Sequence, residues 1–147
     1  MRLFYSLIFY SIVPLVLLRL YWRGFTTPEH RLRWHERFAF YKQTYPKNVI
    51  WFHAVSVGEV EALFPLIRAI QDQHPDQPIL ITTMTPTGST RVKAVLADSV
   101  SHVYVPYDLP DAIVRFMAMF KPKIAVMMET ELWPNLFMYC GKNDIPL

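Results

Sequence analysis

Four times between residues 47 and 147, a short apolar run is followed by a segment with helical periodicity. The apolar runs cover residues 49–57, 78–84, 103–105 and 124–128, and the helical segments cover residues 59–74, 88–97, 110–120 and 133–140. Continuous apolar strands that alternate with amphipathic helices indicate a parallel sheet covered on both faces. We therefore expect an α/β fold, a Rossmann-like doubly wound sheet with strand order 3-2-1-4-5.

The carboxyl-terminal residues 145–147 resemble the start of a fifth strand that is cut off before it can pair. With 147 residues, 52% hydrophobic and 18% charged, the chain has room for one globular domain and an appendage, and a disordered protein is excluded. We expect residues 47–147 to be a truncated amino-terminal domain of a longer protein.

Residues 3–18 carry no charge and are almost entirely apolar. As a helix they span roughly 24 Å, and residues 19–22 can complete a hydrocarbon core of about 30 Å. A signal peptide is disfavoured because no small-residue cleavage site follows, while a helix in the membrane interface stays an alternative. We expect residues 1–23 to anchor the chain in a membrane, with the domain on the cytoplasmic face.

Residues 24–46 form a basic amphipathic junction in which Pro28 can start a helix. Its apolar side chains are Leu32, Trp34 and Phe38, and its polar face carries Arg31, Arg33, His35 and Arg37. This face is either merely solvated or it binds anionic lipid head groups, where each arginine can add about 1 kcal/mol. The net charge of +3 comes from a local cluster of Arg19, Arg23, Arg31, Arg33 and Arg37, so we expect no nucleic-acid partner.

Cys140 is the only cysteine, which excludes an intrachain disulfide and a cysteine-based zinc site. No Gly-x-Gly-x-x-Gly motif follows an apolar run, and histidines and carboxylates do not cluster in metal-ligand spacing. We expect neither a metal nor a cofactor.

Glu59 stands on the first helical turn after the first apolar run, where open α/β sheets bind their ligands. The sequence Ser56-Val-Gly-Glu59 fits a capping box, in which serine and glutamate side chains bond free amides at the helix start. The helix dipole also favours an ionised carboxylate there, as a general base requires. Capping and catalysis are both open at this site.

A second acidic site, Met128-Glu129-Thr-Glu131-Leu-Trp-Pro134, ends the fourth apolar run. In the expected strand order, strands 1 and 4 are neighbours, so Glu59 and Glu129 would face one crevice. Alternatively, Glu129 pairs with an arginine and Glu131 caps the following helix.

Thr85-Pro-Thr-Gly-Ser-Thr90 resembles an anion-binding loop because it presents hydroxyls and amides at a helix start. It lacks the lysine and glycine spacing of a P-loop, and ordinary turn chemistry explains most of it. His53 alternates inward, which favours a packed strand residue over a ligand.

Together, a series of motifs resembles the amino-terminal part of the bacterial 3-deoxy-D-manno-octulosonic acid (Kdo) transferases. In chain order the motifs are Trp34-His-Glu-Arg-Phe38, Trp51-Phe-His-Ala-Val-Ser-Val-Gly-Glu-Val-Glu-Ala62, Thr82-Thr-Met-Thr-Pro-Thr-Gly-Ser89, Pro106-Tyr-Asp108 and Glu129-Thr-Glu-Leu-Trp-Pro-Asn135. The resemblance extends over essentially the whole chain, including the anchor. One departure is Ala39, where the family pattern usually has glycine, and it puts the local turn in doubt.

The resemblance implies an inverting GT-B glycosyltransferase that moves Kdo from CMP-Kdo to a lipid A precursor, lipid IVA, in lipopolysaccharide biosynthesis of Gram-negative bacteria. It implies that Glu59 is the general base and that Glu129 stabilises the transition state. It also implies a missing carboxyl-terminal domain that holds CMP-Kdo, so the chain alone should be inactive. Candidate acceptor contacts are Ser56, Gly58, Arg31, Arg33, Arg37, Thr87, Ser89 and Glu131.

The competing class is a non-catalytic, membrane-tethered α/β module that binds anionic lipid head groups or a protein partner. In that interpretation Glu59 is only a helix cap, Glu129 belongs to an ion pair, and the basic junction is the working surface.

Overall fold

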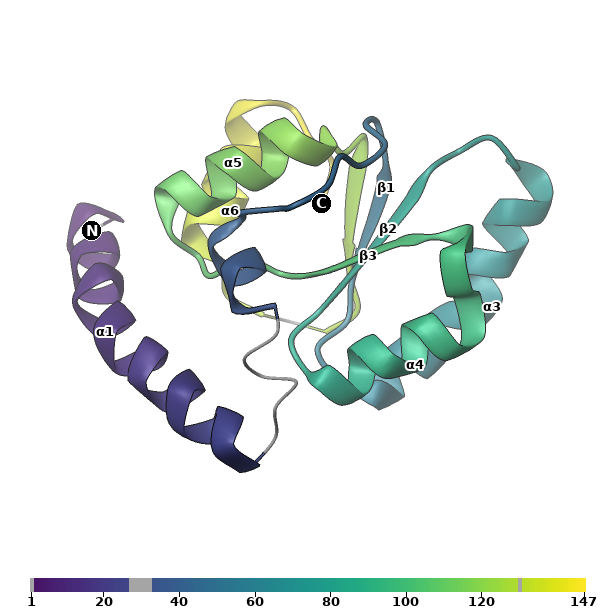
Figure 1. The fold of residues 1–147 in the computed structure, drawn as a ribbon. Helices are drawn as coiled ribbons and strands as arrows, with labels where there is room; N and C mark the ends of the chain where they lie inside the picture. Colours follow the sequence, from purple (N-terminus) through teal and green to yellow (C-terminus); the bar gives the residue numbers. More distant parts are fainter. Residues whose placement is uncertain (1, 27–32, 130) are drawn as a thin grey trace.

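The structure, a computed structural model, describes residues 2–26, 33–129 and 131–147. In chain order its elements are α1 (Arg2–Thr26), the 3-10 helix η1 (Trp34–Phe38), β1 (Ile50–His53), α3 (Val57–Gln73), β2 (Ile79–Thr83), α4 (Pro86–Leu96), the 3-10 helix η2 (Ala97–Ser99), β3 (Ser101–Tyr104), α5 (Pro110–Phe120), β4 (Ile124–Met127) and α6 (Pro134–Lys142). The four strands are parallel in the order β3-β2-β1-β4 (Figure 1). This order confirms the α/β fold and the neighbours expected for the first strand.

Side chains that alternate along the strands fill a core on each face of the sheet. Trp51 of β1 packs on one side, with its ring centroid 4.7 Å from that of Phe116 in α5. Phe52 packs on the other side in a cluster with Leu63 of α3 and Val92 of α4. Helices α5 and α6 therefore cover one face and α3 and α4 the other (Figure 1).

The register places the segments that follow β1 and β4 at one edge of the sheet. His53, the last residue of β1, lies opposite Met127 in β4. Beyond the strand, the backbone N–H of Met128 still donates to the carbonyl of His53 at 3.1 Å. The two carboxylate-bearing segments therefore leave the sheet from adjacent strands.

Two helices begin earlier than the hydrophobic pattern predicts. The first strand ends at His53 and not at residue 57. Residues 54–56 connect it to α3, of which Ser56 is the N-cap. Similarly, Thr85 caps α4, which begins at Pro86. Cap residues end the preceding strand or loop, and apolar periodicity alone does not reveal them.

Residues 145–147 form no strand of the sheet, as expected for a fifth strand that is cut off. They nevertheless contact the sheet, because the N–H of Ala125 in β4 donates to the carbonyl of Pro146 at 2.9 Å. This hydrogen bond places the segment at the outer edge of β4, at the position of strand 5 in the predicted order.

The junction forms a short 3-10 helix beside the edge strand β3. The expected helix start at Pro28 and residues 29–32, including Arg31, lie outside the described residues. Glu36 in η1 is buried and its carboxylate accepts the N–H of Tyr104 at 2.9 Å, which satisfies part of the exposed strand edge.

Ala39 ends η1 in the left-handed region with φ 56°, a conformation that costs a residue with Cβ about 1 kcal/mol. Ala39, which stands where the family pattern usually has glycine, thus occupies a backbone conformation that glycine would adopt without strain.

Among the described residues, α1 contains one stretch long and apolar enough to cross a membrane. It runs from Phe4 to Trp22, 19 residues with a mean hydropathy of 1.7. Length and composition alone do not distinguish a spanning helix from one that lies on the membrane.

Candidate active site

Glu59 is held at the start of α3 by three hydrogen-bond donors. Its Oε2 accepts the N–H of Val55 at 2.8 Å, and its Oε1 accepts the N–H and the hydroxyl of Ser56 at 3.0 and 2.7 Å. The Ser56 hydroxyl in turn accepts the N–H of Glu59 at 3.4 Å, which completes the capping box. The cap prediction is confirmed, and the half-buried carboxylate has a defined position at the sheet edge.

Gly58 lies between these residues without a steric requirement for glycine. A Cβ built there would have only the Ser56 hydroxyl oxygen within reach, at 4.0 Å, and its φ is not positive. The fold by itself therefore does not explain this glycine, and the space beside it is open.

Glu129 lies in a bend after β4 and is exposed to solvent. It lines a cavity of about 370 Å³ together with Glu131, Leu132 and Phe137. Within the part of the chain that the structure describes, its carboxylate has no arginine partner and no hydrogen-bond donor. The alternative that Glu129 pairs with an arginine therefore finds no support among these residues.

Glu131 is fixed by contacts with β1 and with its own loop. Its Oε2 lies 3.1 Å from Nε2 of His53 and accepts the indole N–H of Trp133 at 2.9 Å. The hydrogen bond from His53, followed by that from Trp133, lowers the pKa of Glu131 despite partial burial. The alternative that Glu131 caps α6 is wrong, because the N-cap residue is Trp133, whose side chain makes no cap hydrogen bond, and the first N–H groups of α6 donate to Asp108.

His53 is a packed strand residue, as expected, but it also links two strands to the β4–α6 loop. Its side chain is 2% exposed, and its Nδ1 lies 2.9 Å from the hydroxyl oxygen of Thr82. That oxygen also accepts the indole N–H of Trp51 at 2.8 Å. The two ring nitrogens of His53 therefore contact Thr82 in β2 and Glu131 in the β4–α6 loop.

Asp108 caps α6 from the loop that follows β3. The buried carboxylate accepts the N–H groups of Asn135 and Leu136, both at 2.9 Å. The Asn135 side chain returns a hydrogen bond to the Asp108 carbonyl at 2.6 Å. This arrangement gives the Pro106-Tyr-Asp108 motif a structural role, because it fixes the start of α6 beside the Glu129 loop.

The Thr85–Thr90 loop is explained largely by helix capping, as expected. The Thr85 hydroxyl accepts the N–H of Gly88 at 3.1 Å, and a Cβ on Gly88 would lie 3.0 Å from that hydroxyl. Thr87 is exposed, whereas Ser89 is buried and accepts a hydrogen bond from Arg33 at 3.0 Å. Only Thr87 of the two candidate contacts in this loop presents its side chain to solvent.

Arg33 and Arg37 use their guanidinium groups inside the domain. Arg33 forms a bidentate pair with Glu36 at 2.7 and 2.8 Å and donates to the carbonyl of His102. Arg37 is 5% exposed and donates to the carbonyl of Met84 at 2.8 Å, with its guanidinium 4.6 Å from the Tyr104 ring centroid. The alternative of a merely solvated polar face is therefore wrong for Arg37, since the buried guanidinium has both an acceptor and an aromatic face as neighbours.

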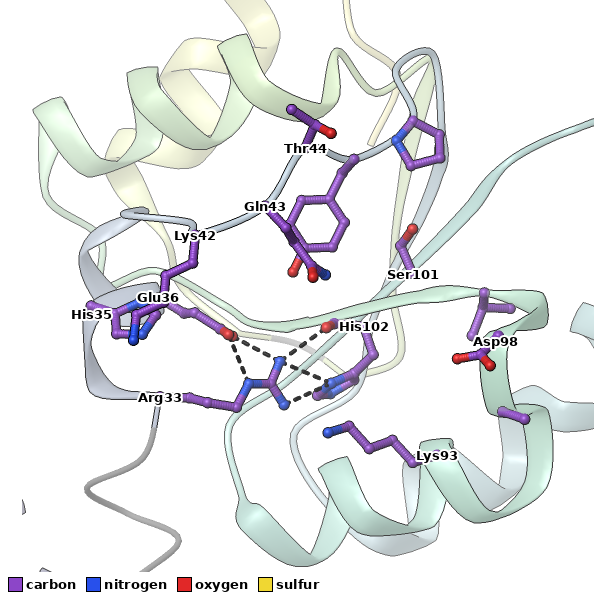
Figure 2. Close-up of a pocket in the computed structure, with 14 residues that line it drawn as sticks. Arg33, His35, Glu36, Lys42, Gln43, Thr44, Lys93, Asp98, Ser101 and His102 are labelled. Atoms are coloured by element: carbon purple, nitrogen blue, oxygen red, sulfur yellow. Dashed lines mark hydrogen bonds and ion pairs between the residues drawn. The ribbon is translucent and has the colours of Figure 1, made fainter.

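A second cavity, of about 810 Å³, lies between η1, β3 and α4 (Figure 2). Figure 2 shows Arg33 between Glu36 and His102, with Lys93 approaching from α4. Burial, followed by the charges of Arg33 and Lys93, lowers the pKa of His102 to about 3, so this imidazole is neutral at physiological pH. This cavity lies where η1 contacts β3, and Glu59 is not among the residues that line it.

The His53–Glu131 and Asp108–α6 contacts were not deduced from the sequence. Their partners are separated by 78 and by 27 or 28 positions, and no local spacing links them. The available signal was topological, since β1 was expected to lie beside β4.

The fold and the acidic groups at its carboxyl edge define a Rossmann-like α/β domain with a candidate ligand site at that edge. Residues 32–147 match the family model described as 3-deoxy-D-manno-octulosonic-acid transferase (kdotransferase). The chain belongs to this Kdo transferase family, as its motifs indicated.

Three relatives show the extent of the similarity. The 3-deoxy-D-manno-octulosonic acid transferase of Haemophilus influenzae is 44% identical over 147 residues, which is 99% of this chain and 34% of that protein. A probable mitochondrial 3-deoxy-D-manno-octulosonic acid transferase of Arabidopsis thaliana is 41% identical over 97% of this chain and 32% of its own length. The 3-deoxy-D-manno-octulosonic acid transferase of Bordetella pertussis is 33% identical over 103 residues, which is 67% of this chain and 24% of that protein. The chain thus spans about a third of the length of the first two relatives.

Proposed function

We propose that the complete protein is a glycosyltransferase that moves Kdo from CMP-Kdo to a lipid A precursor, lipid IVA, in lipopolysaccharide biosynthesis. Family membership supports the transfer of Kdo. The observation that carries the site is Glu59, a carboxylate held by three donors at the start of α3. It follows β1 at the carboxyl edge of the sheet, and Glu129 follows the adjacent strand β4.

In this proposal Glu59 is the general base of an inverting reaction. A hydroxyl of the lipid attacks the anomeric carbon of Kdo from the face opposite the departing CMP, and Glu59 takes the hydroxyl proton. Oε2 of Glu59 accepts only the Val55 N–H among the described residues, so its second lone pair can accept this proton. A fixed carboxylate within hydrogen-bond reach is what general-base catalysis needs.

Glu129 would stabilise the transition state from the neighbouring loop, and the acceptor would contact the open surface around Ser56, Gly58 and Thr87. These positions are exposed, and the unexplained space at Gly58 lets a ligand approach the α3 amino terminus closely. Glu131, Ser89, Arg33 and Arg37 would support the site indirectly, because their polar groups are bonded to the protein. The role of Arg31 stays a prediction, since Arg31 lies outside the described residues.

We propose further that CMP-Kdo binds to a carboxyl-terminal domain, completing a GT-B enzyme, and that the 147-residue chain is inactive without it. The proposal includes no metal or cofactor. The chain would associate with the inner membrane through α1, on the cytoplasmic face.

The non-catalytic alternative is less well supported. It requires arginines of the junction to be available to lipid or to a partner, yet Arg33 and Arg37 are bonded within the domain. It also leaves the open space at Gly58 without a role.

The test is Kdo transfer from CMP-Kdo to lipid IVA by membranes that carry the complete protein, with Glu59→Ala in parallel. We expect product from the wild type and none from the variant at equal membrane content. Absence of transfer by a folded wild-type protein would refute the proposed activity, and equal transfer by both would refute the base assignment.

A further inference from the structure

Helix α1 carries two stripes of side chains on opposite faces. The covered stripe, buried or half-buried, consists of Ser6, Phe9, Val13, Val16, Leu20 and Gly24. The exposed stripe consists of Phe4, Leu7, Leu15, Leu18 and Trp22, which are 70%, 64%, 66%, 54% and 69% exposed, together with the exposed Ser11 between Leu7 and Leu15. Residues three and four apart share one helix face, so each stripe is a continuous line along α1. A helix surrounded by lipid would have no need of a covered face.

Helix α1 is attached to the domain by packing of the covered stripe and by polar contacts from this stripe and its flanks. Phe9 and Val13 pack against the hydrophobic core beneath α5 and α6. The hydroxyl of Tyr5 donates to Asp108 at 3.1 Å, and the hydroxyl of Tyr10 donates to Asp111. Ser6, which is 7% exposed, contacts the Asn135 side chain at 3.4 Å. All of these contacts involve the amino-terminal half of α1.

The acceptors of these contacts cannot follow α1 into a bilayer. Asp108 caps α6, and Asp111 forms an ion pair with Arg115 at 2.7 Å. Moving such carboxylates into hydrocarbon costs several kcal/mol each. A spanning α1 would carry its amino-terminal half away from the domain and break every one of these contacts.

We infer that α1 does not cross the membrane but lies along one leaflet, docked on the domain, with its exposed stripe in the lipid. The occupant of the exposed stripe is a bilayer surface and not a protein. The stripe is apolar except for Ser11, whose hydroxyl donates to the carbonyl of Leu7 within the helix. The helix has no acidic residue, and Arg19 lies beside Leu18, as expected for contact with acyl chains and anionic head groups.

This placement brings the membrane to the edge of the sheet that carries the candidate site. Asp108, Asp111 and Asn135 lie in or after the segments that follow β3 and β4, at the same edge as Glu59 and Glu129. The docking itself does not depend on the proposed Kdo transfer, and its test requires no enzymatic activity.

The first test measures the depth of nitroxide labels in phosphatidylethanolamine–phosphatidylglycerol vesicles that carry the 147-residue chain. Single cysteines replace the exposed α1 side chains Leu7, Ile8, Leu15, Leu18 and Trp22, none of which packs on the domain, in a common background in which the buried core residue Cys140 is changed to Ala. We expect Leu7, Leu15, Leu18 and Trp22 labels at one common depth and the Ile8 label, on the flank, closer to water. A label depth that increases from Leu7 to a maximum near the middle of α1 and decreases again toward Trp22 would indicate a spanning helix and overturn the inference. Labels that are all fully accessible to water would also overturn it.

The second test probes the docking directly with a short bismaleimide. We expect cross-linking of the pair Tyr10→Cys and Asp111→Cys, because these side chains are in contact. The matched pair Ile12→Cys and Asp111→Cys should cross-link several-fold less, since Ile12 lies on the far flank of the helix. Equal yields for both pairs, or no cross-link in the first, would show that α1 is not docked in this orientation.

Discussion

The loops after β1 and β4 leave the same edge of the sheet but hold their carboxylates in different ways. Glu59 receives all of its donors from residues within four positions of it in the chain. The β4–α6 loop is instead fixed at Glu131 by His53 and at the start of α6 by Asp108, while Glu129 between β4 and Glu131 is exposed. One carboxylate is therefore preorganised by its own helix, and the other depends on the surrounding fold.

This difference suggests a division of roles. A general base must have a defined position relative to one proton, and the capping box provides it. An exposed carboxylate can adjust when substrate arrives, and substrate contacts would complete its surroundings. If the division is correct, substitutions in the two loops should separate activity from stability.

The largest effect is expected for Glu59→Gln in the complete protein. Loss of the base should lower kcat about 10²- to 10⁴-fold, because the side-chain amide of glutamine cannot take the hydroxyl proton. Initial rates of Kdo transfer measure this. The matched control is Glu61→Gln on the same helix, whose exposed side chain pairs with Arg91 and should leave kcat unchanged. Equal losses in both variants would indicate a general effect on α3.

Glu129→Gln should lower kcat by roughly 10², the typical cost of removing one preorganised electrostatic group. Its urea unfolding free energy should stay within about 0.5 kcal/mol of the wild type, because the side chain is exposed. A destabilised variant with intact activity would mean that Glu129 is structural, and the contrast between the loops would be lost.

Asp108→Ala should destabilise the folded chain by about 2 kcal/mol, because two backbone N–H groups at the start of α6 lose a charged acceptor. Urea unfolding of the 147-residue chain measures the change. The exposed Asp98 offers a control, and Asp98→Ala should change the free energy of unfolding by less than about 0.5 kcal/mol. Equal stability of the two variants would contradict the capping role.

The smallest effect concerns pH. The folded-state pKa of Glu131 is below its ordinary value of 4.5, so its contribution to stability is present above about pH 4.5 and is lost as the pH falls through the lower folded pKa. The stability difference between wild type and Glu131→Gln should therefore shrink on acidification. A difference that persists or grows in acid would exclude the proposed role of the His53 contact.

Much of the fold followed from patterns along the chain. The fourfold alternation predicted the parallel sheet and placed strand 1 beside strand 4, and the Ser56–Glu59 spacing predicted the capping box. The prediction erred where several weak preferences compete, as at the end of β1 and in the burial of Arg37.

By itself, the sequence determined the elements and caps whose partners lie within one helical turn, because such contacts depend only on spacing. Tertiary structure alone decided that His53 holds Glu131, that Asp108 caps α6 and that α1 has a covered face. These groups meet only when the sheet and its helices are packed, and their contacts contain no local pattern. The physical reason is that a capping amide is supplied by neighbouring residues, whereas a buried imidazole or carboxylate takes its partner from whichever segment the fold brings beside it.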